Sequence, residues 1–225
     1  LNQAARLRNV KPGGNTPEVG SLFNHANEQV RLAAVRLAGG WKNLGPYFPE
    51  LGKLAGDKGT APALREAAFT TLRDIGGQGA IDSFAALTGR DTDPGIRRQA
   101  VLALAALRLD RALPAAVEVL TGTIAEADAL ALWRSLLNIK GAAAALAKAL
   151  PKSGIPPVVG KAGLRAAREG GRSEPDLILA ITRGSGLDEG EVSLSETELK
   201  QLVADVQSKG DPARGEAVYR RKDLS

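Results

Sequence analysis

The sequence predicts an all-α protein, an α-solenoid (α–α superhelix) of about five stacked helical hairpins. Three observations predict this architecture. A pattern of large apolar residues recurs five times, at intervals of about 31–34 residues. Within each copy the apolar residues fall on one face of an α-helix. No single hairpin can bury such a face, so neighbouring copies must stack and share one core.

The first helix of each hairpin carries the repeat most clearly. Two copies lie 64 residues apart, which is two units of 32, and their apolar positions match as Phe69/Trp133, Leu72/Leu136 and Ile75/Ile139. A glycine follows each copy, at Gly77 and Gly141, as expected for the left-handed residue that closes a helix. Further copies span residues 30–41, 100–107 and 158–171, and the first of these ends in Ala38-Gly39-Gly40-Trp41.

A shorter apolar stretch follows each copy and predicts the second helix of the hairpin. These stretches are Tyr47–Leu54, Ala80–Leu87, Ala112–Leu120, Ala142–Leu150 and Pro175–Ile181. Ala and Leu dominate the composition, whereas aromatic residues make up only 4%. Such a composition favours many short helices in close contact.

Three copies share a motif of an apolar residue, Arg and a later Ala. It begins at Val30-Arg31, Leu64-Arg65 and Ile96-Arg97. This motif resembles the signature of HEAT repeats, and the resemblance covers about residues 17–183. In that family an Asp–Arg ladder joins neighbouring repeats, but here only Asp93 clearly supplies the acid, and Ala129 replaces the Arg of the fourth copy.

The aligned Arg31, Arg65 and Arg97 are the candidate binding residues of the solenoid. They could line a groove for an acidic peptide or phosphates. The alternative, which we favour, is a structural role at helix caps and helix C-termini. Asp91, Asp93 and Asp110 likewise suggest a carboxylate pair, but helix capping is the better interpretation. Trp41 and Trp133 fall on apolar stripes and are expected in the core.

The chain after the repeats has a different character. Residues 1–186 hold 24 Lys and Arg against 16 Asp and Glu, whereas residues 187–225 hold 6 against 9. We therefore expect a solenoid over 1–183, a flexible glycine-rich linker over 184–194 and terminal helices over 195–225. The first terminal helix begins with a capping box at Ser195 and runs to Gln207.

The segment Gly210–Tyr219 resembles the first helix of class I c-type cytochromes. Gly215 and Tyr219 occupy the positions at which that helix crosses the last helix of the haem domain. With the repeats, this segment resembles large multidomain proteins of planctomycetes and verrucomicrobia that carry a C-terminal Cys-x-x-Cys-His haem domain. The resemblance implies covalent haem c just beyond this chain, electron transfer or dehydrogenase chemistry in the parent protein, and a periplasmic or extracytoplasmic location. A single amphipathic terminal helix is the alternative.

The chain itself offers little for catalysis. It has no Cys and one His, His25, which we expect on the surface between helices. Neither a metal cluster nor a Ser-His-Asp triad is indicated, so no catalytic, cofactor-binding or metal-binding residue is predicted. The absence of Met and the first residue, Leu1, indicate a piece of a larger protein.

These features predict a non-catalytic scaffold or protein-interaction solenoid. Its expected partners are other domains of the same chain or another protein. We expect a monomer, and the sequence has no membrane segment. A second hypothesis is a basic nucleic-acid-binding module similar to the HEAT-like DNA glycosylases, although no aromatic residue flanks an Asp in a repeat. An enzyme is the third and least favoured hypothesis.

Overall fold

The computed structural model describes residues 18–41, 47–169, 174–187, 196–211 and 215–216. The chain divides into two compact units, residues 1–187 and residues 188–225. Every regular element in the described ranges is helical. None of these helices is long and apolar enough to cross a lipid bilayer.

Unit 1 contains five helical hairpins, which confirms the predicted α-solenoid. The first helices are α3 (Glu28–Trp41), α5 (Pro62–Ile75), α7 (Pro94–Leu107), α9 (Glu126–Leu137) and α11 (Pro157–Arg168). The second helices are α4 (Phe48–Gly56), α6 (Gly77–Ala86), α8 (Leu109–Leu120), α10 (Ala142–Ala149) and α12 (Pro175–Ser185). Four of these ten helices begin with Pro, whose fixed φ and missing N–H suit the first helical position.

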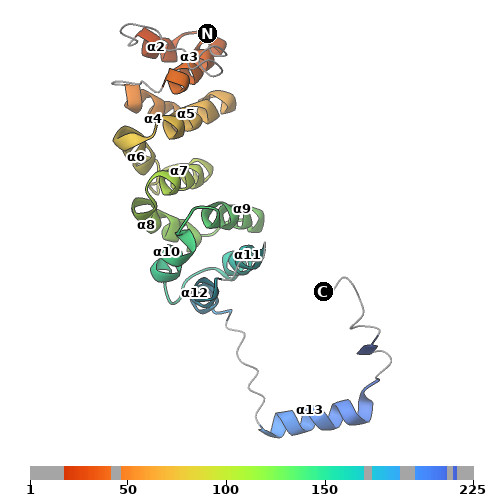
Figure 1. The fold of residues 1–225 in the computed structure, drawn as a ribbon. Helices are drawn as coiled ribbons and strands as arrows, with labels where there is room; N and C mark the ends of the chain where they lie inside the picture. Colours follow the sequence, from red (N-terminus) through yellow and green to blue (C-terminus); the bar gives the residue numbers. More distant parts are fainter. Residues whose placement is uncertain (1–17, 42–46, 170–173, 188–195, 212–214, 217–225) are drawn as a thin grey trace. The chain divides into compact units, whose positions relative to one another are not determined.

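The hairpins stack so that first and second helices form two columns. One column holds α3, α5, α7, α9 and α11, and the other holds α4, α6, α8, α10 and α12 (Figure 1). The closest first-helix contacts are α3 on α5 and α9 on α11. One continuous core runs between the columns, and its largest fully buried side chains include Trp133, Phe23, Phe84 and Leu51. Each hairpin therefore shelters the apolar face of its neighbour.

The N-terminal end of the core is covered by short elements. These are α2 (Glu18–Ser21) and a 3-10 turn, η1 (Leu22–Asn24). Phe23 is 1% exposed and meets the ring of Tyr47 edge-on, with the ring centroids 5.8 Å apart. Both short elements pack on α3 and so cover part of its apolar face.

Glycines have two different tasks in this stack, and the sequence pattern did not separate them. Gly76 (φ 66°) and Gly141 (φ 81°) take backbone conformations that other residues avoid, between the two helices of a hairpin. The first copy, expected to end in Ala38-Gly39-Gly40-Trp41, does end at Trp41, and its two glycines lie inside α3. A Cβ on Gly39 would lie 2.9 Å from Thr71 Oγ1, so this glycine lets α3 approach α5.

The predicted linker also begins too early. Residues 184 and 185 belong to α12, and Gly186 closes that helix in the left-handed conformation (φ 62°). Gly184 is buried. A Cβ there would lie 2.7 Å from the carbonyl oxygen of Pro151, so no larger residue fits at this position. The N–H of Ile155 donates to the carbonyl of Gly184 at 2.9 Å, which ties this turn to the preceding loop. Residues 188–194 of the expected linker lie outside the described residues.

Unit 2 contains α13 (Glu196–Lys209), which contains most of the predicted terminal helix and ends two residues later than expected. Val203 and Val206 are 48% and 62% exposed on one face of α13. In the cytochrome-like segment, the N–H of Gly215 donates to the carbonyl of Asp211 at 2.9 Å. Tyr219 lies outside the described residues, so the helix crossing expected at Gly215 and Tyr219 stays a prediction.

Candidate functional site

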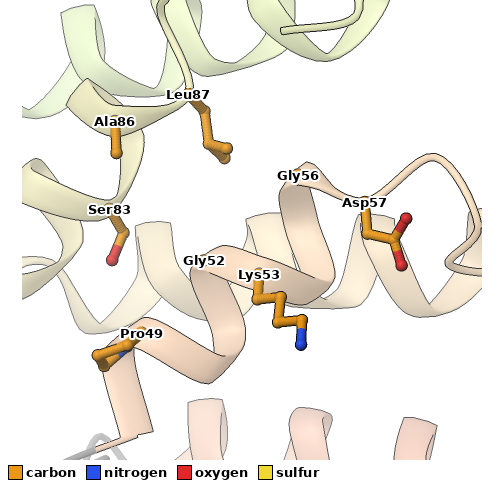
Figure 2. Close-up of a pocket in the computed structure, with 8 residues that line it drawn as sticks. All are labelled: Pro49, Gly52, Lys53, Gly56, Asp57, Ser83, Ala86 and Leu87. Carbon is orange, nitrogen blue, oxygen red and sulfur yellow. The ribbon is translucent and has the colours of Figure 1, made fainter.

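A groove with a volume of about 450 Å³ lies between the second helices α4 and α6. It opens because small residues face one another across these helices, as Figure 2 shows. Its lining residues are Pro49, Gly52, Lys53, Gly56, Asp57, Ser83, Ala86 and Leu87. A Cβ on Gly56 would lie 2.5 Å from Leu87 Cδ2, so this glycine leaves room for the Leu87 side chain.

Two polar side chains of this groove, Ser83 and Asp57, form hydrogen bonds with the backbone. The Ser83 hydroxyl donates to the carbonyl oxygens of Gly79 at 2.8 Å and of Phe48 at 3.4 Å. The Asp57 carboxylate accepts from the N–H of Gly59 at 2.8 Å and holds the turn before α5. Lys53 stands exposed at the rim. The groove therefore offers apolar surface and one cation, and it lacks a base placed to activate Ser83.

A second groove, of about 290 Å³, separates the first helices α5 and α7. It is lined by Glu66, Phe69, Thr70, Arg73, Gln99, Leu102, Ala103 and Ala106. Charged and amide groups stand at its edges, and Phe69 and Ala103 form part of its floor. This groove marks the loosest packing in the first-helix column.

Arg97 is the most deeply placed of the three aligned arginines. Its side chain is 14% exposed. Nε donates to the carbonyl of Thr88, just after α6, at 2.8 Å, and Nη2 lies 2.6 Å from Glu118 Oε2 on α8. Arg97 thus joins the C-terminal end of one hairpin to the second helix of the next, and its donors face protein rather than an open groove.

Glu118 holds two guanidinium groups at once. Arg90 pairs with its Oε1, and Arg97 pairs with its Oε2. Partial desolvation raises the pKa of the Glu118 carboxyl, but the hydrogen bond from Arg90 and the charges of Arg97 and Arg90 together outweigh it. The pKa of Glu118 is therefore lowered.

Arg31 and Arg65 are placed differently from Arg97. Arg31 Nη1 donates to the carbonyl of His25 at 3.0 Å, and its Nε is buried without a hydrogen-bond partner in the described part of the chain. Arg65 is partly exposed, and its guanidinium group has no hydrogen bond or ion pair among the described residues. The three arginines occupy equivalent helix positions but do not form a continuous row of contacts.

Asp93 takes the place expected of the ladder acid, with an unexpected partner. Its Oδ1 accepts from the N–H groups of Gly95 at 2.9 Å and Ile96 at 3.2 Å, so it caps α7 as predicted. Its Oδ2 lies 3.1 Å from Nζ of Lys58, which precedes α5 in the neighbouring hairpin. The hydrogen bond from the Ile96 N–H and then that from Lys58 lower the pKa of Asp93. At this ladder position the partner of Asp93 is thus a lysine of the neighbouring repeat rather than an arginine.

The other carboxylates of interest serve as local partners. Asp110 lies in the first turn of α8, where Arg108 Nε and Nη2 each approach its carboxylate at 3.1 Å. The hydrogen bond from Arg108 lowers the pKa of Asp110. Asp91 is exposed in the loop before α7. Within the described ranges, no three or more His, Asp or Glu side chains converge as metal ligands would.

The two tryptophans and the histidine differ in burial. Trp133 is fully buried, and its Nε1 donates to the carbonyl of Val159 on α11 at 3.0 Å, which confirms core packing. Trp41 is only partly buried at the end of α3. His25 is exposed between η1 and α3, as predicted, and its Nδ1 accepts from the N–H of Asn27 at 3.0 Å.

Stacked hairpins with an apolar-Arg-x-x-Ala first helix, an Asp cap and a paired arginine are the features expected of HEAT repeats. A family model described as HEAT repeats matches residues 16–105 and 59–137, which together span more than half of the chain. The chain belongs to the HEAT-repeat family. No curated protein and no solved structure matches it. The HEAT assignment covers α3 through α9 directly, and α10 to α12 continue the same stacking.

Proposed function

We propose that this HEAT solenoid is a non-catalytic scaffold that holds attached domains or a protein partner at a fixed spacing. The observation that supports this most directly is the continuity of the stack, in which specific polar contacts accompany apolar packing at every hairpin junction. Shared cores between successive repeats give such arrays their stiffness.

The junction contacts differ in kind but recur from end to end. Between the first and second hairpins, the Thr71 hydroxyl donates to the carbonyl of Val35 at 3.0 Å. Between the second and third, Arg111 pairs with Asp82 at 3.1 Å. Between the third and fourth, Arg98 pairs with Asp128 at 2.8 Å. The fourth and fifth are joined by the Trp133 hydrogen bond to Val159.

A finer proposal concerns the parent protein. We propose that the solenoid lies within a haem-containing, electron-transfer or dehydrogenase-type protein of an extracytoplasmic compartment. The support is the likeness of Gly210–Tyr219 to the first helix of class I c-type cytochromes. In this chain the N–H of Gly215 donates to the carbonyl of Asp211. This chain has no Cys, so it cannot itself form the thioether bonds to haem c.

Reading the gene beyond the codon for Ser225 tests the finer proposal. A Cys-x-x-Cys-His motif directly downstream is the expected result. A stop codon, or a different domain there, would remove the haem context and leave the scaffold proposal unchanged.

Distance measurements between spin labels test the scaffold. Because the chain has no Cys, labels attach only where cysteines are introduced, at Glu28→Cys in α3 and Asp176→Cys in α12. A rigid spacer gives one narrow distance distribution. The control pair, Ala63→Cys with Gln78→Cys inside one hairpin, gives the width due to the labels alone. A distribution several times broader than this control would show that the solenoid cannot fix a spacing.

A further inference from the structure

The positive charge of the solenoid is unevenly distributed. Residues 18–137 hold 13 Lys and Arg against 13 Asp and Glu, so this part is neutral. Residues 138–187, which include α10, α11 and α12, hold 8 against 3. The surplus that makes the solenoid basic therefore lies largely in its last hairpins.

Few carboxylates are available to the cations of this basic part. Glu169 serves two arginines: Arg134 of α9 reaches both of its oxygens, with Nε and Nη2 at 2.7 and 2.6 Å, and Arg165 of α11 lies 3.6 Å away. The side chains of Lys161 and Arg168 have no hydrogen bond or ion pair within the described ranges. The contrast with the paired arginines of α7 and α8 is direct.

The cations of α11 lie on one exposed face. Lys161, Arg165 and Arg168 are spaced by four and three residues, which places them along one side of the helix. All three are exposed, and Val158, one turn before Lys161, is 46% exposed on the same side. Arg134 adds a fourth cation through the shared Glu169. We name these five residues the α11 cationic face.

The helix dipole explains only part of this arrangement. Cations in a last turn interact favourably with helix carbonyls, which accounts for Arg165 and Arg168. It does not account for Lys161 in the middle of α11, nor for the shortage of carboxylates around it. Four cations that share a single carboxylate, Glu169, together with an exposed valine, instead suit a partner that supplies both acidic and apolar groups.

We propose that the α11 cationic face docks an acidic segment of a partner protein, one that places carboxylates on the cations and an apolar side chain on Val158. This inference rests on the proposed role as an interaction scaffold and names the chemistry of its partner. A polypeptide fits better than a nucleic acid because residues 138–187 contain no aromatic residue on which a base could stack. Three cations of α11 and one of α9 would also make few contacts with the phosphates of a nucleic acid.

Fluorescence anisotropy with three synthetic peptides tests the proposal. The probes are repeats of Glu-Glu-Leu, of Glu-Glu-Ser and of Gln-Gln-Leu, each labelled at one end. The Glu-Glu-Leu peptide is expected to bind most tightly at low salt and to weaken as salt rises, because surface charge pairs are screened. The Lys161→Glu/Arg168→Glu double variant is expected to weaken this binding by about tenfold or more.

The matched control changes the same charge elsewhere. Arg36→Glu/Arg73→Glu reverses two exposed cations of α3 and α5 that have no ion pair in the described ranges. It is expected to alter Kd by less than about twofold, since distant surface charges are screened. Val158→Ser is expected to weaken binding of the Glu-Glu-Leu peptide and to leave the Glu-Glu-Ser peptide unaffected.

Three results would overturn the proposal: no peptide binding at low salt, equal loss in both double variants, or duplex DNA binding more tightly than the peptide at the same face. Circular dichroism of each variant confirms that the helices are intact. A narrow spin-label distance distribution together with failed peptide binding would leave the scaffold standing and remove only this docking site.

Discussion

The junction between α9 and α11 and the junction between α5 and α7 join equivalent helices in opposite ways. At α9/α11, a Cβ on Gly163 would lie 2.7 Å from Trp133 Cε2, so the glycine admits the indole and the helices pack closely. At α5/α7, a groove of about 290 Å³ remains between side chains such as Phe69 and Leu102. One junction is a filled core contact, and the other is open to solvent.

The difference shows that residue size at the contact sets helix approach, even when the repeat length is constant. A glycine opposite a large aromatic lets two helices meet across a buried hydrogen bond, whereas larger residues on both helices hold them apart. Polar contacts then take different forms. The close junction uses Trp133 and Val159, and the open one is bridged at its edge by Lys58 and Asp93.

Removing the Trp133 indole from the α9/α11 junction is expected to have the largest effect on stability. Trp133→Ala deletes a fully buried side chain and leaves a cavity, so the unfolding free energy is expected to fall by about 3–5 kcal/mol. Urea denaturation followed by circular dichroism measures it. Trp41→Ala, at a partly exposed position, is the control and should cost clearly less. Equal losses would mean that the α9/α11 contact has no special weight.

Filling the space beneath the indole is expected to cost less. Gly163→Ala forces Trp133 to shift and should lower the unfolding free energy by about 1–3 kcal/mol. Gly52→Ala in α4 is the matched helical substitution, because its Cβ would meet Ser83 at an ordinary 3.4 Å. That variant should be stabilised by up to about 1 kcal/mol, since Ala favours helix over Gly. The two variants should therefore move the melting temperature in opposite directions.

The aligned arginines extend the comparison to polar contacts. Arg97→Ala removes the hydrogen bond to Thr88 and the ion pair to Glu118, and we expect a loss of about 1–2 kcal/mol. Arg65→Ala, at the equivalent position of the preceding repeat, should change stability by less than about 0.5 kcal/mol. If both substitutions cost the same, the shared motif rather than the observed contacts determines the effect.

The smallest expected effect concerns charge at the edge of the open junction. The pKa of Asp93 is lowered in the folded chain, so its charge stabilises the fold above the ordinary carboxyl pKa. That contribution is lost as the pH falls through the lower, folded value. The wild type should melt at a higher temperature than Asp93→Asn at about pH 6, and this difference in melting temperature should shrink as the pH falls to about 3. A difference that stays constant or grows on acidification would contradict this role.

The sequence predicted the stack well because apolar spacing reports directly on which helix face is buried. The helix start at Asp93 followed from local chemistry alone, and the structure confirms the cap. Glycines were harder, because a helix-ending glycine and a packing glycine look alike in sequence. Gly39 was placed at the end of the first copy and Gly184 in the linker, yet each lies in a helix where a neighbour leaves no room for a Cβ.

The grooves and the bridges between repeats were beyond the sequence. Lys58 and Asp93 are 35 residues apart, and the motif pointed to an arginine as the partner of Asp93, so only the stacking geometry identifies Lys58. The groove between α4 and α6 depends on how far these helices separate, which the apolar pattern does not specify. The α11 cationic face was visible only as excess charge until its helix face and its missing partners were known.

Hydrogen exchange of the Gly163→Ala variant tests the central claim, that each hairpin is held by its neighbours alone, most directly. Amide protection measured by mass spectrometry should fall in α9, α10, α11 and α12 and stay at the wild-type level in α3 and α4. A uniform loss of protection from α3 to α12 would show one globally cooperative core and contradict the account.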